Sequence, residues 1–182
     1  RSRLNELDYD TIPYEKMPLG SVIQVERTAG LHTGSFSTTS GSFQPVNQLV
    51  VSFEPHFYNS LIKIDVNVQY FFHSDWNNSG NYAVFTVYRN GDINLADNAY
   101  TEQSTTTTYN GNSGSVGVWF AAQAPFANYN HTATFTLWDI PHTTQTSQYK
   151  LYYRMHVTGG TRRLYTGWNS HHDSIAVSEI KQ

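Results

Sequence analysis

Two tryptophans stand among short polar residues in a pattern that could bind a sugar. Trp76 lies among Ser, Asp, Asn and Gly at residues 74–80, and Trp168 lies among Thr, Gly, Asn, Ser, His and Asp at residues 165–173. An indole offers a flat apolar surface, and the neighbouring polar groups offer hydrogen bonds, a combination that suits stacking against a pyranose ring. The alternative is that each indole anchors its own loop. The candidate ligand-binding residues are Trp76, Asn77, Asn78, Trp168, Asn169, His171 and Asp173.

The run His171-His172-Asp173 has the residue types of a metal site. Neighbouring residues of a strand point to opposite faces, so both histidines could bind one ion only in a loop. On a symmetry axis, each chain would need to supply only one or two ligands. A polar loop with surface histidines is the simpler interpretation. We therefore predict neither a metal site nor a cofactor.

Acidic residues are scattered rather than paired. A glycosidase needs two carboxylates that face each other across a cleft, and no spacing in this sequence favours such a pair. No G-x-S-x-G motif supports a serine hydrolase, and the glycine-rich residues 111–117 lack the lysine and following helix of a phosphate-binding loop. The prediction is a protein that is not an enzyme and has no catalytic residues, with a glycan-degrading enzyme as a less favoured alternative.

The composition restricts the partners. Charged residues make up 14% of the chain, the net charge is −3 and no run of Lys or Arg occurs, so nucleic acid is not expected as a main partner. No apolar stretch approaches the roughly 18 residues that a membrane-spanning helix needs, so no membrane partner is expected. Cysteine is absent, which excludes disulfides and thiolate metal sites.

Alternation of apolar and polar residues indicates strands from about residue 20 onwards. In residues 61–70, Ile, Val and Tyr fall on one face, and Lys63 lies on the polar face. Residues 148–157 repeat this pattern, with Tyr152 on the polar face. The dipeptide Asn90-Gly91 predicts a tight hairpin. Further strands are expected at residues 21–27, 48–53, 82–89, 116–121, 131–138 and 174–181.

These strands predict an all-β fold, because no helical stripe accompanies them. The sequence has no internal repeat, which argues against a propeller or a solenoid. The predicted architecture is a jelly-roll-like antiparallel β-sandwich that forms a head domain over residues 20–182. Residues 1–19 mix charges with leucines and contain Pro13 and Pro18. They are expected to form a short extended N-terminal lead-in, and the alternative is a disordered terminus.

Short motifs in the second half of the chain follow a common pattern. Residues 139–144 read Asp-Ile-Pro-His-Thr-Thr, and a tyrosine-rich strand follows. A Gly-Gly-Thr turn at residues 159–161 comes next, and the final strand ends in Glu179-Ile180. All of these motifs consist of turns and strand faces, so they point to structure rather than to catalysis.

With the opening strand at residues 20–25 and the hairpin Arg89-Asn90-Gly91, these motifs identify a resemblance. Over about residues 20–182, the chain resembles a domain of marine phage structural and tail-fibre-like virion proteins. Segments 73–81 and 97–114 do not match that pattern, and such loops would carry specificity.

The resemblance implies a virion location, on the exposed surface of a capsid or tail fibre. It also implies a homotrimer that contacts other virion proteins and binds a host cell-surface glycan or receptor. One alternative is a purely architectural capsid-decoration or fibre-joint protein. An exposed aromatic loop site would favour receptor binding, and a broad apolar patch would favour the joint. A deep cleft with paired carboxylates would favour an enzyme.

Overall fold

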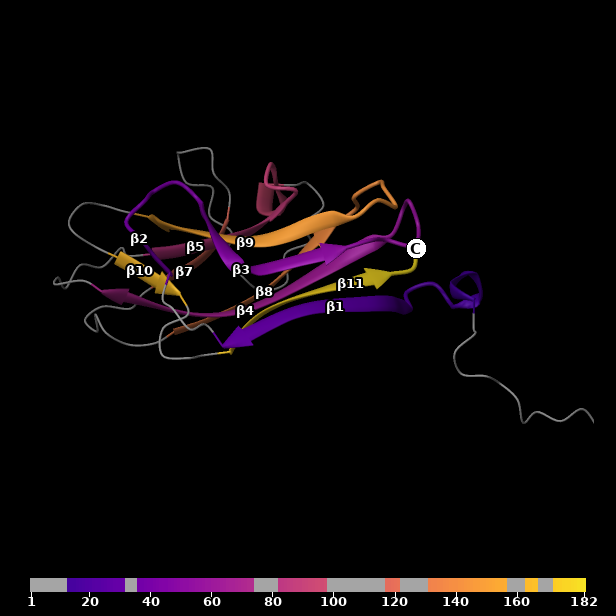
Figure 1. Ribbon diagram of the computed structural model, residues 1–182, viewed down its shortest axis with the longest axis horizontal. Coiled ribbons are helices and arrows are strands. Elements are labelled where there is room, and N and C mark those ends of the chain that lie inside the picture. The colour runs from indigo at the N-terminus through magenta and orange to yellow at the C-terminus, as the bar shows by residue number, and fades with distance from the viewer. Residues whose placement is uncertain are drawn as a thin grey trace, which may run out of the picture.

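The computed structural model describes residues 13–31, 36–73, 82–97, 117–121, 131–156, 163–166 and 172–182. Within these residues, two antiparallel β-sheets lie face to face, and the long strands run along the long axis of the molecule (Figure 1). The all-β class that the alternating pattern predicts is therefore confirmed.

The first sheet consists of β1 (Val22–Leu31), β2 (Phe36–Thr38), β4 (Leu61–His73), β8 (His131–Asp139), β10 (Arg163–Thr166) and β11 (His172–Ile180). β4 lies at its centre. It pairs with β11 along its first half and with β10 near its end, while β8 pairs with its other edge. β1 pairs with β11, and β2 pairs with β10.

The second sheet consists of β3 (Gln44–Phe53), β5 (Tyr82–Arg89), β6 (Ile93–Asn94), β7 (Val118–Ala121) and β9 (Ser147–His156). β9 lies between β3 and β5, and β7 and β6 pair with different parts of the free edge of β5. Two short 3-10 turns accompany the strands: η1 (Tyr14–Lys16) and η2 (Leu95–Asp97).

The strand order is that of a jelly roll. The first sheet has the order β1-β11-β4 followed by β8, and the second has the order β3-β9-β5 followed by β7. The first and last of these strands, β1 and β11, are neighbours (Figure 1). Two Greek keys in two facing sheets define the eight-stranded jelly roll. The predicted jelly-roll type is therefore confirmed as well.

The apolar faces of both sheets form the core. On β4, the four alternate residues from Ile62 to Val68 are buried, whereas the side chain of Lys63 between them is 37% exposed. The alternate residues of β9 point into the same core: Tyr149, Leu151, Tyr153 and Met155. The predicted inward faces of both strands are thus confirmed.

The hairpin between β5 and β6 also follows from its sequence. Asn90 and Gly91 have φ angles of 54° and 84°, in the left-handed region that a mirror-image two-residue turn requires. Asn and Gly tolerate this region better than other residues. Most other strands lie within a few residues of their predicted bounds, while the short β2 is not among the predicted strands.

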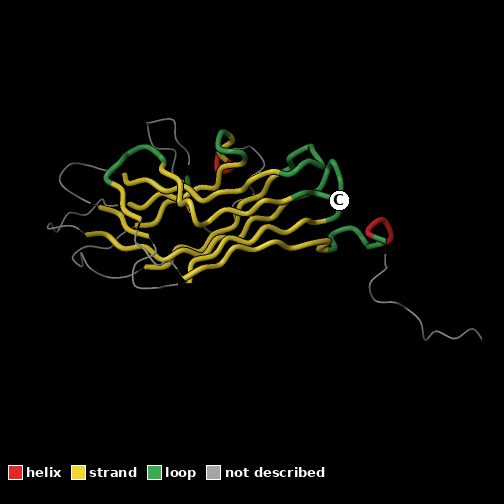
Figure 2. The backbone as a smooth tube through the Cα atoms, viewed as in Figure 1, coloured by secondary structure: helices red, strands yellow, loops and turns green. Residues whose placement is uncertain are grey.

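The N-terminal lead-in is partly described, from Pro13 onwards, and this part is not extended throughout. It forms η1 and is then held against the last residues of the chain (Figure 2). The Nζ atom of Lys181 donates to the backbone oxygens of Glu15 and Met17 at 2.6 and 2.7 Å, and the Gly20 N–H donates to the Lys181 oxygen at 2.8 Å. We call this end of the sandwich the lead-in end and the opposite end the far end.

Candidate functional site

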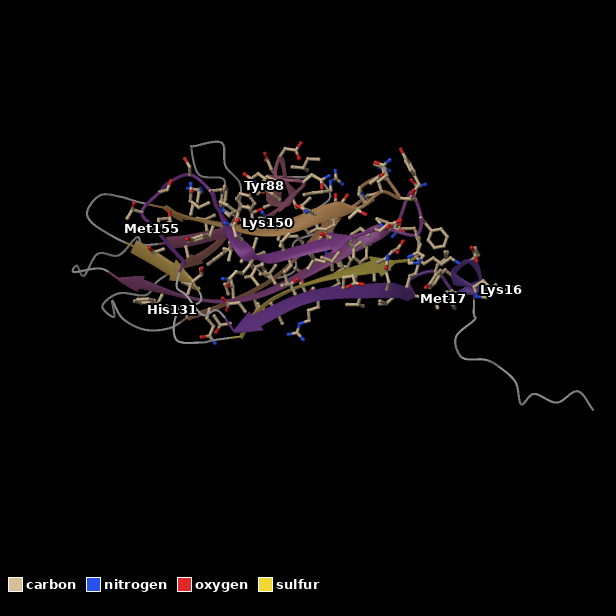
Figure 3. All side chains as sticks on the ribbon, viewed as in Figure 1. Lys16, Met17, Tyr88, His131, Lys150 and Met155 are labelled. Carbon is tan, nitrogen blue, oxygen red and sulfur yellow. The ribbon has the colours of Figure 1, made fainter. Side chains whose placement is uncertain are left out.

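Six predicted ligand-binding residues lie outside the described residues: Trp76, Asn77, Asn78, Trp168, Asn169 and His171. The strand ends that flank them can be placed. β4 ends at His73, and Thr166 at the end of β10 pairs with Tyr70 of β4. β11 begins at His172, which pairs with Leu31 at the end of β1. The Trp76 stretch therefore leaves β4 at the far end, and the Trp168 stretch leaves β10 three residues inward from it, level with His131, which Figure 3 labels.

Asp173, the seventh predicted residue, is described and lies in β11 rather than in a loop. Its side chain is fully buried, and its Oδ1 atom accepts a hydrogen bond from the Gln69 N–H at 2.8 Å. A buried carboxylate in this position joins β11 to β4. It is better suited to fixing the strand next to the predicted Trp168 loop than to touching a ligand itself.

Aromatic side chains gather on the outer face of the second sheet. The Tyr88 and Tyr152 rings lie 4.4 Å apart between centroids, and Phe43 packs edge-on to Tyr88 at 6.0 Å. The guanidinium carbon of Arg154 lies 5.2 Å from the centroid of Phe43. Lys150 pairs with Tyr88 across the strands, and Figure 3 shows the two close together over this face. The predicted polar-face residue Tyr152 thus belongs to a half-buried aromatic cluster.

Asp139 forms a buried ion pair between the two sheets. The Nη1 atom of Arg89 on β5 donates to both carboxylate oxygens of Asp139 at 3.0 and 2.8 Å, and the Tyr149 hydroxyl donates at 2.9 Å. Burial raises the pKa of Asp139, although Arg89 and Tyr149 oppose the rise. This carboxylate is fully enclosed, so it locks the sheets together and is not placed to meet a substrate.

Glu179 is a second buried carboxylate, at the lead-in end. It accepts hydrogen bonds from the backbone N–H groups of His56 and Phe57 at 2.9 and 3.1 Å, from the Ser60 hydroxyl, and from Gln24 at 2.8 Å. Nδ1 of His56 lies 2.9 Å from Oε2. Burial alone would raise the pKa of Glu179, but these hydrogen bonds hold it below its usual range. The carboxylate therefore fixes the β3–β4 connection to the last strand.

An open pocket of about 260 Å³ lies beside that connection. It is lined by Phe57, Tyr58, Asn59, Ser60, Lys181 and Gln182. Its lining contains aromatic rings, amides and one ammonium group but no acidic side chain. This pocket was not predicted, because no motif in the sequence links residues 57–60 with the last strand.

In the described part of the chain, no group of three or more His, Asp or Glu side chains could hold a metal ion. In the same residues, no helix is long and apolar enough to cross a membrane.

The short motifs that suggested the resemblance meet in space. Arg89 comes from the hairpin motif and Asp139 from the Asp-Ile-Pro motif, and the two form the buried ion pair. Glu179 comes from the final Glu-Ile motif and accepts a hydrogen bond from Gln24 in the opening strand. Sequence reasoning identified these motifs as structural but did not pair them. The available signal was that Arg89, Asp139 and Glu179 each belong to a short motif at or next to the end of a strand.

Comparisons with known proteins find similarity among solved structures. No protein-family model matches the chain, and no curated protein matches it in sequence. Among solved structures, it is similar to "Structure of infectious bursal disease virus Gx strain", with 11% identity over 87% of this chain and 32% of that chain and a TM-score of 0.45. It is also similar to the infectious bursal disease virus VP2 subviral particle, with 14% identity over 87% of this chain and 38% of that chain and a TM-score of 0.38. The chain thus spans about a third of the length of each. TM-scores this low do not establish a shared fold, so the jelly roll is defined by its own strand order.

Proposed function

We propose that this chain is a structural domain of a virus particle that attaches the particle to a host-surface glycan or receptor. The observation that carries the proposal is the jelly roll with two different ends. Jelly rolls occur in viral capsid and lectin domains. A fold alone does not set a function, so the placement of the candidate residues on it matters more.

The placement supports recognition at the far end. The ends of β4 and β10 and the start of β11, which flank the Trp76 and Trp168 stretches, lie close together. Thr166 of β10 pairs with Tyr70 of β4, and Asp173 of β11 accepts a hydrogen bond from Gln69 of β4. Loops on a rigid sandwich can vary without disturbing the core. The lead-in occupies the opposite end, so a support joined there would leave the far end facing outwards.

The proposed mechanism is multivalent attachment. Each domain would contribute a weak site, and a homotrimer would hold three equivalent sites on one rigid head. Linked weak sites raise the overall avidity because the second and third contacts form at a high effective concentration. Attachment of this kind requires no reaction on the receptor, so the proposal includes no enzymatic activity.

Substitution of the two loop tryptophans tests this proposal. Trp76→Ala and Trp168→Ala should each weaken binding of the purified protein to host cells by about tenfold or more, since loss of a stacked ring costs on the order of 1 kcal/mol or more per contact and contacts multiply in a trimer. Their melting temperatures should stay close to that of the unchanged protein. Trp138→Ala is the matched control, because Trp138 lies on a strand and not in either loop.

Two results would contradict the loop site. If either loop variant unfolds, that tryptophan is a structural anchor. If both fold and bind cells normally, recognition does not depend on them. If the unchanged protein binds neither host cells nor glycans, the proposed attachment to a receptor is wrong.

The alternative function, an architectural joint, is favoured by the distribution of exposed apolar residues. Six large apolar side chains are exposed among the described residues, and all but Ile93 lie at or near the lead-in end: Tyr14, Leu19, Val22, Val25 and Tyr58. Exposed apolar side chains that gather at one end suit contact with another protein. Val22→Ser combined with Val25→Ser should then release the domain from the particle, measured by co-sedimentation with virions, and leave cell binding of the free protein unchanged.

A further inference from the structure

The β3–β4 connection forms part of the wall of the pocket at the lead-in end, and hydrogen bonds fix its conformation. Its backbone N–H groups at His56 and Phe57 both donate to the buried Glu179, and the Ser60 N–H closes a turn onto the Phe57 oxygen at 3.2 Å. The Ser60 hydroxyl donates to the same carboxylate. The pocket wall is therefore organised before any ligand arrives, which lowers the entropic cost of binding.

Tyr58 stands at the tip of this connection as an exposed aromatic plate. Its side chain is 59% exposed, and its ring is supported by the His142 ring at a centroid distance of 5.5 Å and a tilt of 38°. His142 has a φ angle of 50°, in the left-handed region that residues other than glycine rarely adopt. Such strain persists where surrounding structure imposes it, and it clusters at ligand sites.

The chemistry of the lining indicates the class of ligand. The rings of Phe57 and Tyr58 offer apolar surface, and the amides of Asn59 and Gln182 offer both donors and acceptors. Two of the three N–H donors of Lys181 are engaged by the backbone oxygens of Glu15 and Met17, which directs its ammonium group towards the lead-in. Rings beside amides suit a ligand that combines an apolar face with several hydroxyl groups.

We infer that this pocket binds one neutral pyranose ring, stacked on Tyr58 and hydrogen-bonded to Asn59 and Gln182. The volume of about 260 Å³ suits a single ring rather than a longer chain. The site lies at the lead-in end and is independent of the predicted tryptophan loops at the far end. A domain with both sites could hold one glycan at two points, separated by the length of strands of about 10 residues, roughly 30 Å.

Nuclear magnetic resonance titration of the full chain tests this inference. The probes are the methyl glycosides of glucose, galactose, mannose and N-acetylglucosamine. At least one should shift the backbone amide signals of Tyr58, Asn59 and Gln182, with a Kd on the order of 1–10 mM. Tyr58→Ala should weaken this binding by about tenfold, whereas Tyr58→Phe should keep it, because the ring and not the hydroxyl forms the plate.

Ile93→Ala is the control, since it removes an exposed apolar side chain outside the pocket. It should leave the titration unchanged. The inference is overturned if no probe shifts the three amide signals, or if a probe binds but Tyr58→Ala binds it equally well. Neither result bears on attachment through Trp76 and Trp168, which is measured on host cells, so the two proposals can fail separately.

Discussion

At the scale of single residues, neighbours on one strand have opposite roles. Ile64 is fully buried in the core, whereas Lys63 is partly exposed and pairs with Asp65 at 2.8 Å on the outer face. Ile64→Ala should lower the free energy of unfolding by about 2–4 kcal/mol, because it removes buried methylene groups and leaves a cavity. Lys63→Ala should cost less than about 1 kcal/mol, since exposed ion pairs contribute little. Urea denaturation measures both, and equal effects would show that the inward face is wrongly assigned.

The ion pair between Arg89 and Asp139 makes a different prediction at this scale. The carboxylate is fully buried and the Arg89 side chain is 13% exposed. Arg89→Met should destabilise the protein by about 3–5 kcal/mol, because it leaves a buried carboxylate without its cation. Replacing both residues, with Arg89→Met and Asp139→Leu, should recover part of that loss. A double-mutant cycle in urea gives the coupling energy, and additive losses would mean that the pair is not coupled.

At the scale of elements, Glu179 ties the β3–β4 connection to β11 and makes this tie dependent on pH. Its folded pKa lies below the usual range, so its contribution to stability is present above the unfolded value of about 4.3 and is lost as the pH falls through the lower folded pKa. Compared with Glu179→Gln, the unchanged protein should be more stable at pH 7, and the difference should shrink towards pH 3. A difference that stays constant over this range would contradict the role of the ionised carboxylate.

The elements also show how far the sequence predicts this fold. The strict alternation around Ile64 and the Asn90-Gly91 turn depend on neighbouring residues, so their strands and hairpin could be predicted from local patterns. The short β2 has too few residues to show a period of two. Arg89 and Asp139 are 50 residues apart, and Ser60 and Glu179 are 119 residues apart. Contacts over such separations arise from the topology, so neither the buried clusters nor the pocket could be derived from spacing.

At the scale of the whole molecule, the described residues of the jelly roll show different features at its two ends. The lead-in end carries two hydrogen-bonded locks, through Glu179 and Lys181, and most of the exposed large apolar side chains of the described residues. The far end gathers the strand ends from which the predicted tryptophan stretches leave. This polarity suits a domain that is fixed near its lead-in and meets a receptor at the far end, as the proposed function requires, and the pocket beside Tyr58 is then a separate site at the fixed end.

Trimer formation is the prediction that belongs to this scale. If the lead-in runs along a three-fold axis, light scattering at micromolar concentration should give about three times the 20.7 kDa mass of one chain.

Cyclic symmetry brings three copies of a residue near the axis close together. Leu19, which is 75% exposed on the lead-in, should then tolerate charge poorly. Leu19→Glu should shift the protein towards monomer because three like charges repel, and added salt should partly reverse the shift. Ile93→Glu on the β5–β6 hairpin should leave the mass unchanged. A single monomer peak for the unchanged protein would exclude axial assembly, and with it the multivalent mechanism that rests on three sites in one head.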